Sequence, residues 1–194
     1  MITITESNLY WNFFLALEKD LNNVSRYIEF SESNWDTYSI ELVRLLLTVS
    51  SEVDVLLKEL CLLLDTNSNA NNINDYKTRI KSKLPAFIEE KVFINRYGLN
   101  FKPWSNWRGN DNPIWWCSYN HVKHKRNQFY KDANLKNILN AFGALLITNL
   151  YYYKAKFEKE ENTIFICRDV MRKLQPESEL LTLNGDYYYS TLIV

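Results

Sequence analysis

The stretch that decides the fold is residues 37–64, TYSIELVRLLLTVSSEVDVLLKELCLLL. Its apolar side chains recur at steps of three and four residues, which is the period of an amphipathic α-helix. The stripe consists of Leu42, Leu45, Leu46, Val49, Val53, Leu56, Leu57, Leu60, Leu63 and Leu64. At about 100° per residue, Glu41, Glu52 and Glu59 line one border of this stripe. We expect Glu52, in the middle of the helix, to meet a neighbouring helix, and the other two acids to be solvated.

Two neighbouring stretches repeat the helical period. Residues 9–30 form the first expected helix, with Ser7 as its N-terminal cap. Residues 75–95 form another, in which Pro85 should cause a kink or a split because proline lacks a backbone N–H donor. Residues 65–74 lie between the helices expected at residues 37–64 and 75–95. They contain five asparagines and should form a surface loop.

The second half of the chain predicts two more helices. One covers residues 115–130, and Pro113 suits its first position. The other uses Asp132 as its cap and fades into the charged segment 154–162, KAKFEKEEN. The sequence therefore predicts a bundle of four long helices and a shorter kinked one.

The connection between residues 96 and 113, RYGLNFKPWSNWRGNDNP, has no helical period. Connections of this length are usually disordered or functional. Trp104 and Trp107 favour order, because aromatic rings of that size are normally packed.

The character of the sequence changes after the last expected helix. Residues 163–170, TIFICRDV, are rich in β-branched side chains. Asn184 and Gly185 lie between two apolar runs, which is a common signal of a β-hairpin. We therefore expect a helical bundle over residues 1–160 and a small C-terminal β-hairpin appendage over residues 161–194, packed on the bundle.

Composition agrees with a mainly α fold. The 194 residues include four glycines and four prolines, and 46% are hydrophobic. So few turn-forming residues favour long helices around one core over a protein of many strands.

The charge balance limits the kinds of partner. With 23 basic and 23 acidic residues the formal net charge is zero, which excludes a globally cationic, histone-like binder, so any contact with nucleic acid must be local. Three separated cysteines without a C-x-x-C pair fit reduced thiols in a cytoplasm. No signal peptide, long apolar run, phosphate loop or dinucleotide fingerprint is visible. We expect a cytoplasmic protein with no membrane contact and no cofactor.

The segment 115–129, WWCSYNHVKHKRNQF, contains both histidines of the chain. On a helix, Asn120, Lys123, His124 and Asn127 fall within an arc of about 100°. Imidazoles exchange protons near neutral pH, and a lysine can stabilise a negative phosphate oxygen. This face is sufficient to cleave RNA through its own 2′-hydroxyl without a metal ion. The alternative for His124 is a core histidine that is hydrogen-bonded to a neighbour.

Candidate roles in this segment extend beyond that face. A basic side chain can hold a phosphate, and aromatic rings can stack on bases. The candidate RNA-binding residues are Lys125, Trp116 and Tyr119. The aromatic residues would otherwise close the end of the bundle or form an interface between two copies.

Arg126 does not fit the polar arc, because the same projection places it on the apolar side of the helix. A buried guanidinium needs a partner, and we expect Arg126 to pair with Glu52 or to stack on a tryptophan. A bent helix would instead bring Arg126 to the polar face, where it is a candidate catalytic residue.

His121 and Asn127 are candidate supporting residues. His121 is expected to be a partly exposed polar residue. A metal site built on His121 and His124 is not expected, since no cysteine or carboxylate lies at ligand spacing in the segment. Cys117 lies among tryptophans without an evident triad, which gives a cysteine nucleophile little support.

The order of these elements resembles a divergent bacterial member of the HEPN superfamily, the higher eukaryotes and prokaryotes nucleotide-binding domains. The residues that carry the resemblance are SSEVDVLLKEL at 50–60 and WW-x-x-YN-x-VKH-x-R at 115–126, followed by a long helix rich in asparagine and leucine. The similarity covers about residues 9–156.

The resemblance implies an up-and-down helical bundle that forms a homodimer. Many members are metal-independent endoribonucleases of toxin–antitoxin or antiviral defence systems, in which an arginine and a histidine four to six positions later meet their dimer mates. His124 is the counterpart of the family histidine, and Glu52 resembles the polar residue of an earlier helix. Arg126 follows His124 here, so it is only a candidate counterpart of the arginine.

Two functions follow from the resemblance. The first is an RNA-binding protein that cleaves RNA without a metal. The alternative is a non-catalytic interaction module that binds a protein or nucleotide partner. The expected partners are RNA or a nucleotide, a second copy of the chain and an antitoxin-type protein.

Overall fold

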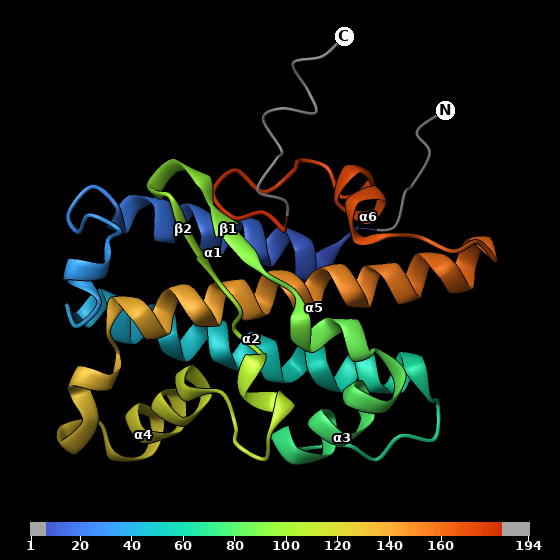
Figure 1. The fold of residues 1–194 in the computed structure, drawn as a ribbon, viewed down its shortest axis with the longest axis horizontal. Helices are drawn as coiled ribbons and strands as arrows, with labels where there is room; N and C mark the ends of the chain where they lie inside the picture. Colours follow the sequence, from blue (N-terminus) through green and yellow to red (C-terminus); the bar gives the residue numbers. More distant parts are fainter. Residues whose placement is uncertain (1–6, 184–194) are drawn as a thin grey trace, which may run out of the picture.

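The computed structural model describes residues 7–183, and its secondary structure is mainly helical (Figure 1). The described residues form α1 (Leu9–Val24), α2 (Ile40–Leu64), α3 (Ile73–Lys83), α4 (Ile114–Phe129), α5 (Leu135–Glu161) and α6 (Cys167–Lys173). A small antiparallel sheet pairs β1 (Val92–Ile94) with β2 (Leu99–Phe101). The prediction of a mainly α fold is confirmed.

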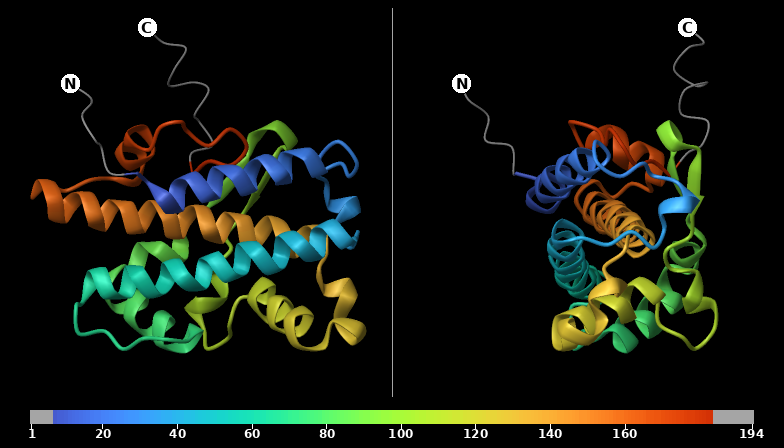
Figure 2. Two further views of the ribbon diagram at one scale, coloured as in Figure 1. Left: turned by 180° about the vertical axis from the view of Figure 1, so that it is seen from behind. Right: turned by 90° about the vertical axis from the view of Figure 1, so that its left-hand side faces the viewer.

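Helices α2 and α5 lie along one another at the centre of the molecule (Figure 1). The stripe of α2 is buried as predicted, from Leu42 through Val53 to Leu60. Helix α5 is buried on nearly all faces between Leu135 and Tyr153. The views in Figure 2 place α1 and α6 on one side of α5, and α3 and α4 on the opposite side. Burial of apolar area along these two helices is the main stabilising contribution.

Two of the predicted N-terminal caps are wrong. Helix α1 begins after Asn8, and Ser7 instead accepts a hydrogen bond from the side-chain amide of Asn12. Helix α5 is capped by Asn134, whose side-chain oxygen accepts from the backbone N–H of Asn137 at 3.0 Å. Asp132 lies two residues before that cap and is free to contact another element. Capping by an Asx side chain requires an extended backbone at the cap, which Asn134 has.

Helix boundaries also differ from the prediction at two places. Helix α1 ends at Val24, six residues earlier than predicted. Helix α3 ends at Lys83, and residues 85–89 form a 3₁₀ turn that leads into β1, so the predicted helix does not continue beyond Pro85. The physical reason is that proline stops the helix and the following residues gain ladder hydrogen bonds from β2.

The connection to α4 is ordered, as its tryptophans predicted. Trp104 and Trp107 are fully buried, and both pack on Phe87, with ring centroids 5.3 and 6.2 Å away. Trp104 also contacts Trp115 edge to face at 5.2 Å. This aromatic cluster fixes the start of α4 against the 3₁₀ turn at residues 85–89.

The prediction of a β structure at residues 163–170 is wrong, because α6 occupies Cys167–Lys173. Ile164 and Ile166 are largely exposed, so the β-branched side chains there do not face a partner strand. Farther along, Thr182 bridges Phe93 of β1 through backbone hydrogen bonds of 2.8 and 3.0 Å. The predicted hairpin at Asn184 and Gly185 lies outside the described residues.

Candidate functional site

Helix α4 holds the cluster of basic residues and histidines at the side of the bundle opposite α1 (Figure 2). Its inward face is apolar, and Trp115, Tyr119 and Val122 are buried against α2 and α5. The helix is broken at Lys125, where φ is −139° and ψ is 48°. The last turn, which begins at Arg126, therefore departs from the direction of the first three turns.

Three of the four predicted catalytic residues, Lys123, His124 and Arg126, are exposed on α4, whereas Asn120 is half-buried. Lys125 and Asn127, predicted to bind RNA and to support the site, are also exposed. The alternative of a core histidine at His124 is therefore wrong. The prediction that Arg126 points inward is also wrong, because the break at Lys125 turns it to solvent.

Lys123 is held in place by a neighbouring tyrosine. Its ammonium donates to the hydroxyl of Tyr119 at 3.2 Å and lies 5.2 Å from the centroid of that ring. Tyr119 and Trp116 are 5% and 8% exposed. Rings so deeply buried offer little face to a base, so Tyr119 supports Lys123 instead of forming a stacking platform.

The predicted pair of Glu52 and Arg126 does not form. Glu52 is half-buried, and burial raises its pKa. Its negative charge acts on Tyr10 of α1, whose pKa is raised by burial and by the nearby acids. Among residues 7–183, Arg126 forms no ion pair. Helices α1 and α4 lie on opposite sides of the bundle, so an acid that faces α1 cannot reach Arg126 (Figure 2).

Asp54 is the acid of α2 that faces the candidate site. It lies two residues after Glu52, about 200° around the helix. Burial raises the pKa of Asp54, while a hydrogen bond with Tyr76 of α3 and the positive charge of Lys123 lower it. The sequence analysis missed Asp54, although it lies within the segment SSEVDVLLKEL that carried the resemblance.

His121 has a carboxylate partner that the sequence analysis also missed. Its Nδ1 lies 2.8 Å from Oδ2 of Asp132, and its ring stacks on Phe129 with centroids 4.4 Å apart. Since a carboxylate can only accept, Nδ1 carries the hydrogen and Nε2 has no protein partner within the described part of the chain. The side chain is about half exposed, at 49%. His121 is partly exposed as predicted, but it is held in one orientation.

A depression of about 460 Å³ lies beside His121. It is formed by the loop before α3, the residues before α4, one turn of α4 and Asp54 of α2. Its polar lining includes Asn71, Asn112 and Asn120. The loop 65–74, predicted only to be a surface loop, thus contributes to the site.

Cys117 lies in this depression one turn before His121. Burial and the negative charge of Asp111 raise the pKa of the Cys117 thiol. A raised pKa keeps the sulfur protonated at neutral pH and makes it a poor nucleophile. Within residues 7–183, no group of three or more histidine, cysteine, aspartate or glutamate side chains is arranged to hold a metal ion.

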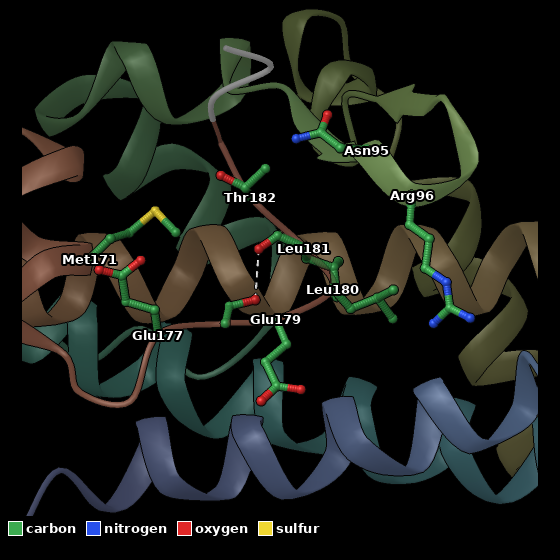
Figure 3. A pocket seen from close by; sticks show the side chains of 9 residues that line it. Asn95, Arg96, Met171, Glu177, Glu179, Leu180, Leu181 and Thr182 are labelled. Carbon is green, nitrogen blue, oxygen red and sulfur yellow. Dashed lines mark hydrogen bonds between the residues drawn. The ribbon is translucent and has the colours of Figure 1, made fainter. Parts of the chain in front are cut away.

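A second, much smaller pocket of about 50 Å³ lies near the C-terminal segment. Figure 3 shows it between Asn95 and Arg96 on one side and Met171 and Glu177 on the other. Its floor is a turn in which the hydroxyl of Ser178 donates to the carbonyl of Leu181 at 2.6 Å. Its size and its internal hydrogen bond indicate a structural turn.

Comparison with known proteins finds no matching family model, no matching curated protein and no matching solved structure. In the part of the chain that the structure describes, no helix combines the length and apolarity needed to cross a membrane.

Proposed function

We propose that this protein is a HEPN-like RNA-binding protein that cleaves RNA at α4 without a metal ion. The observation that carries the proposal is the position of the two histidines of the chain. Both are solvent-accessible, they lie on successive turns of one helix, and Lys123 lies between them in sequence. Exposed imidazoles beside a cation are the groups that RNA transesterification requires.

In the proposed reaction each imidazole carries out one proton transfer. The 2′-oxygen attacks phosphorus while the bond from phosphorus to the 5′-oxygen breaks. His121, whose imidazole is oriented by Asp132, takes the proton of the 2′-hydroxyl. His124 gives a proton to the departing 5′-oxygen. The products are a 2′,3′-cyclic phosphate and a 5′-hydroxyl.

The charged and polar neighbours support this chemistry. Lys123 stabilises the negative oxygens on phosphorus, because its ammonium is exposed and held by Tyr119. The charges of Asp54 and Lys123 act on one another in the site. Lys125 and Arg126, on the exposed turn after the break, bind flanking phosphates.

The test is cleavage of a fluorescent single-stranded RNA in EDTA by the purified protein. We expect cleavage by the wild type and a fall of about 10²–10⁴-fold in rate for His124→Asn and for His121→Asn, as for the loss of a general acid or base. Mass spectrometry should find a 2′,3′-cyclic phosphate on the product.

The matched control is Lys19→Gln, which removes an exposed cation from α1 on the opposite side of the bundle. Its rate should equal that of the wild type. Thermal unfolding of each variant shows whether the fold is retained. If the wild type binds RNA and cleaves none of several sequences, the catalytic proposal fails and a non-catalytic interaction module takes its place.

A further inference from the structure

The depression beside His121 has the size of a ligand site. Its volume of about 460 Å³ lies within the usual range of small-molecule pockets, about 300–1,000 Å³. Most of its lining residues are polar, and they include the amides of Asn71, Asn112 and Asn120 beside the largely buried Trp116. A molecule with several polar edges suits a depression lined by amide groups.

One lining amide is already satisfied by the protein. The side-chain oxygen of Asn72 accepts from the backbone N–H groups of Asn74 and Asp75 at 3.0 and 3.2 Å. Its NH₂ group donates to Asp75 at 2.7 Å and to Asn71 at 3.2 Å. Asn72 is therefore the cap of α3 and has no hydrogen-bonding capacity left for a ligand.

Other lining groups keep acceptors without partners. The side-chain oxygen of Asn112 is buried and has no hydrogen-bond partner, while its NH₂ group donates to Asn74 at 3.4 Å. The NH₂ group of Asn120 donates to the carbonyl of Trp116 at 2.9 Å, which leaves its oxygen for another donor. Asp54 adds a carboxyl group to the same depression. A buried acceptor without a partner is unusual in a folded protein.

We infer that this depression is a subsite for one unpaired base of the RNA, and that it prefers bases with an exocyclic amino group over uracil. The inference rests on the proposed function, because His121 forms part of both sites. Adenine and cytosine present an amino group and guanine an amino group and a ring N–H, whereas uracil presents a single ring N–H. The acceptors of Asn112, Asn120 and Asp54 match the amino-bearing bases. A duplex cannot place a base in a pocket, so the substrate is single-stranded.

The first experiment measures base preference without cleavage. The His124→Asn variant is titrated against fluorescent pentanucleotides of adenine, cytosine or uracil, and binding is followed by fluorescence anisotropy. We expect the adenine and cytosine oligomers to bind at least 10-fold more tightly than the uracil oligomer. Equal binding of all three would overturn the subsite.

The second variant removes the side-chain oxygen of Asn112, which has no hydrogen-bond partner. Adding Asn112→Ala should bring the three affinities to within about 2-fold of one another and leave uracil binding unchanged, since phosphate contacts remain. The matched control is Asn69→Ala, an exposed asparagine of the neighbouring loop outside the depression, which should keep the preference. Weakening of all three oligomers to the same extent by Asn112→Ala would contradict the inference.

The second experiment uses Cys117 as a reporter of occupancy. Cys117 lines the depression and is exposed, whereas Cys61 is buried. Alkylation of Cys117 by excess iodoacetamide at mildly alkaline pH, where more of its thiol is ionised, is followed by mass spectrometry and should slow at least 5-fold in the presence of the saturating adenine oligomer. The uracil oligomer should protect less. Unchanged alkylation with bound adenine oligomer would show that no base enters the depression.

Adenosine 5′-monophosphate is tested in the same alkylation experiment. Protection of Cys117 by it at the same concentration would identify a free nucleotide as the ligand in place of RNA.

The two proposals fail in different ways. Cleavage without base preference and without protection of Cys117 removes the subsite and keeps the enzyme. Protection of Cys117 by an oligomer that the wild type does not cleave removes the enzyme and keeps the subsite.

Discussion

At the scale of the residue, Glu18 of α1 holds residues 178–181 on the bundle. Its side chain is only 4% exposed. One carboxylate oxygen lies 2.5 Å from the hydroxyl oxygen of Ser178, which shares its single hydrogen between this carboxylate and the carbonyl of Leu181. The same carboxylate oxygen accepts from the backbone N–H groups of Leu180 and Leu181 at 3.1 and 3.0 Å. The other accepts from the N–H of Glu179 at 3.1 Å. Burial raises the pKa of Glu18, and these four donors oppose that shift.

We predict that Glu18→Gln destabilises the protein by about 1–3 kcal/mol, although the side chain keeps its size. Glutamine offers one acceptor oxygen, and its NH₂ group would face the donor N–H of Glu179, which leaves a buried donor unsatisfied. Urea unfolding at neutral pH measures the change. The control is Glu29→Gln, an exposed acid beyond the end of α1, which should stay within about 0.5 kcal/mol of the wild type. Equal stability of Glu18→Gln and wild type would show that Glu18 does not secure the segment.

A second residue-scale result concerns the two acids of α2. Glu52 and Asp54 are two positions apart, and this small difference in sequence directs one to α1 and the other to α3 and α4. A helix rotates by about 200° over two residues. The acid whose charge acts on Lys123 therefore lies two positions from Glu52, which was predicted to pair with Arg126, and on the other side of the helix.

At the scale of the element, the β1–β2 hairpin lies directly against α5 at Gly143. A Cβ atom at this position would lie 2.6 Å from Cε2 of Phe101 and 3.2 Å from Cγ2 of Val92. The missing side chain of Gly143 lets the hairpin approach the helix backbone. The hairpin in turn covers one face of α5 where no helix packs on it (Figure 1).

We predict that Gly143→Ala destabilises the protein by about 1 kcal/mol, although alanine has a higher helix propensity than glycine. Alanine favours a helix interior by about 1 kcal/mol over glycine, while overpacking of a core typically costs about 1–3 kcal/mol. Thermal unfolding followed by circular dichroism measures the net effect. The double variant Gly143→Ala/Phe101→Leu should be less destabilised than the sum of its single variants, because the leucine leaves room for the methyl group.

The control for this prediction is Gly109→Ala. A Cβ atom there meets only the carbonyl oxygen of Asn106 at 3.8 Å, an ordinary contact. We expect a change within about 0.5 kcal/mol. A Gly143→Ala variant that is more stable than the wild type would mean that the hairpin is not packed as described.

At the scale of the whole molecule, we propose that two copies associate with their α4 surfaces around a shared groove. One copy offers the cations Lys123, Lys125 and Arg126 around its exposed histidines, which is a small number of phosphate contacts for firm binding of RNA. A two-fold axis beside α4 would double them. The proposal agrees with the resemblance, which implies a dimer in which His124 of each copy lies near the two-fold axis.

Two measurements test the dimer. Light scattering at micromolar concentration should give twice the mass of the chain. The slope of log K against log salt for single-stranded RNA should be about −4 for six cations, against about −2 for three, at about −0.7 for each contact. A strict monomer, or a dimer in which His124 of each copy faces away from the shared groove, would contradict a composite site.

The sequence by itself determined where most helices lie. In α2, α4 and α5 the apolar period is long enough to be read locally, and the buried faces follow from it. The ordered conformation of the connection before α4 was also predictable, because tryptophans such as Trp104 and Trp107 rarely remain exposed. The shared polar arc of Lys123, His124 and Asn127 followed from the same helical projection, whereas the exposure of Arg126 did not.

Only the tertiary structure decided which groups meet. The fate of residues 163–170 depended on whether a partner strand was available, which is a non-local condition, and they lead into α6 instead. His121 meets Asp132 because the chain reverses after the break at Lys125. Asp54 faces Lys123 because α3 and α4 pack on one flank of α2 and α1 on the other. A periodic pattern gives the angle of each side chain around its own helix, whereas the neighbour at that angle is set by the packing of the whole bundle.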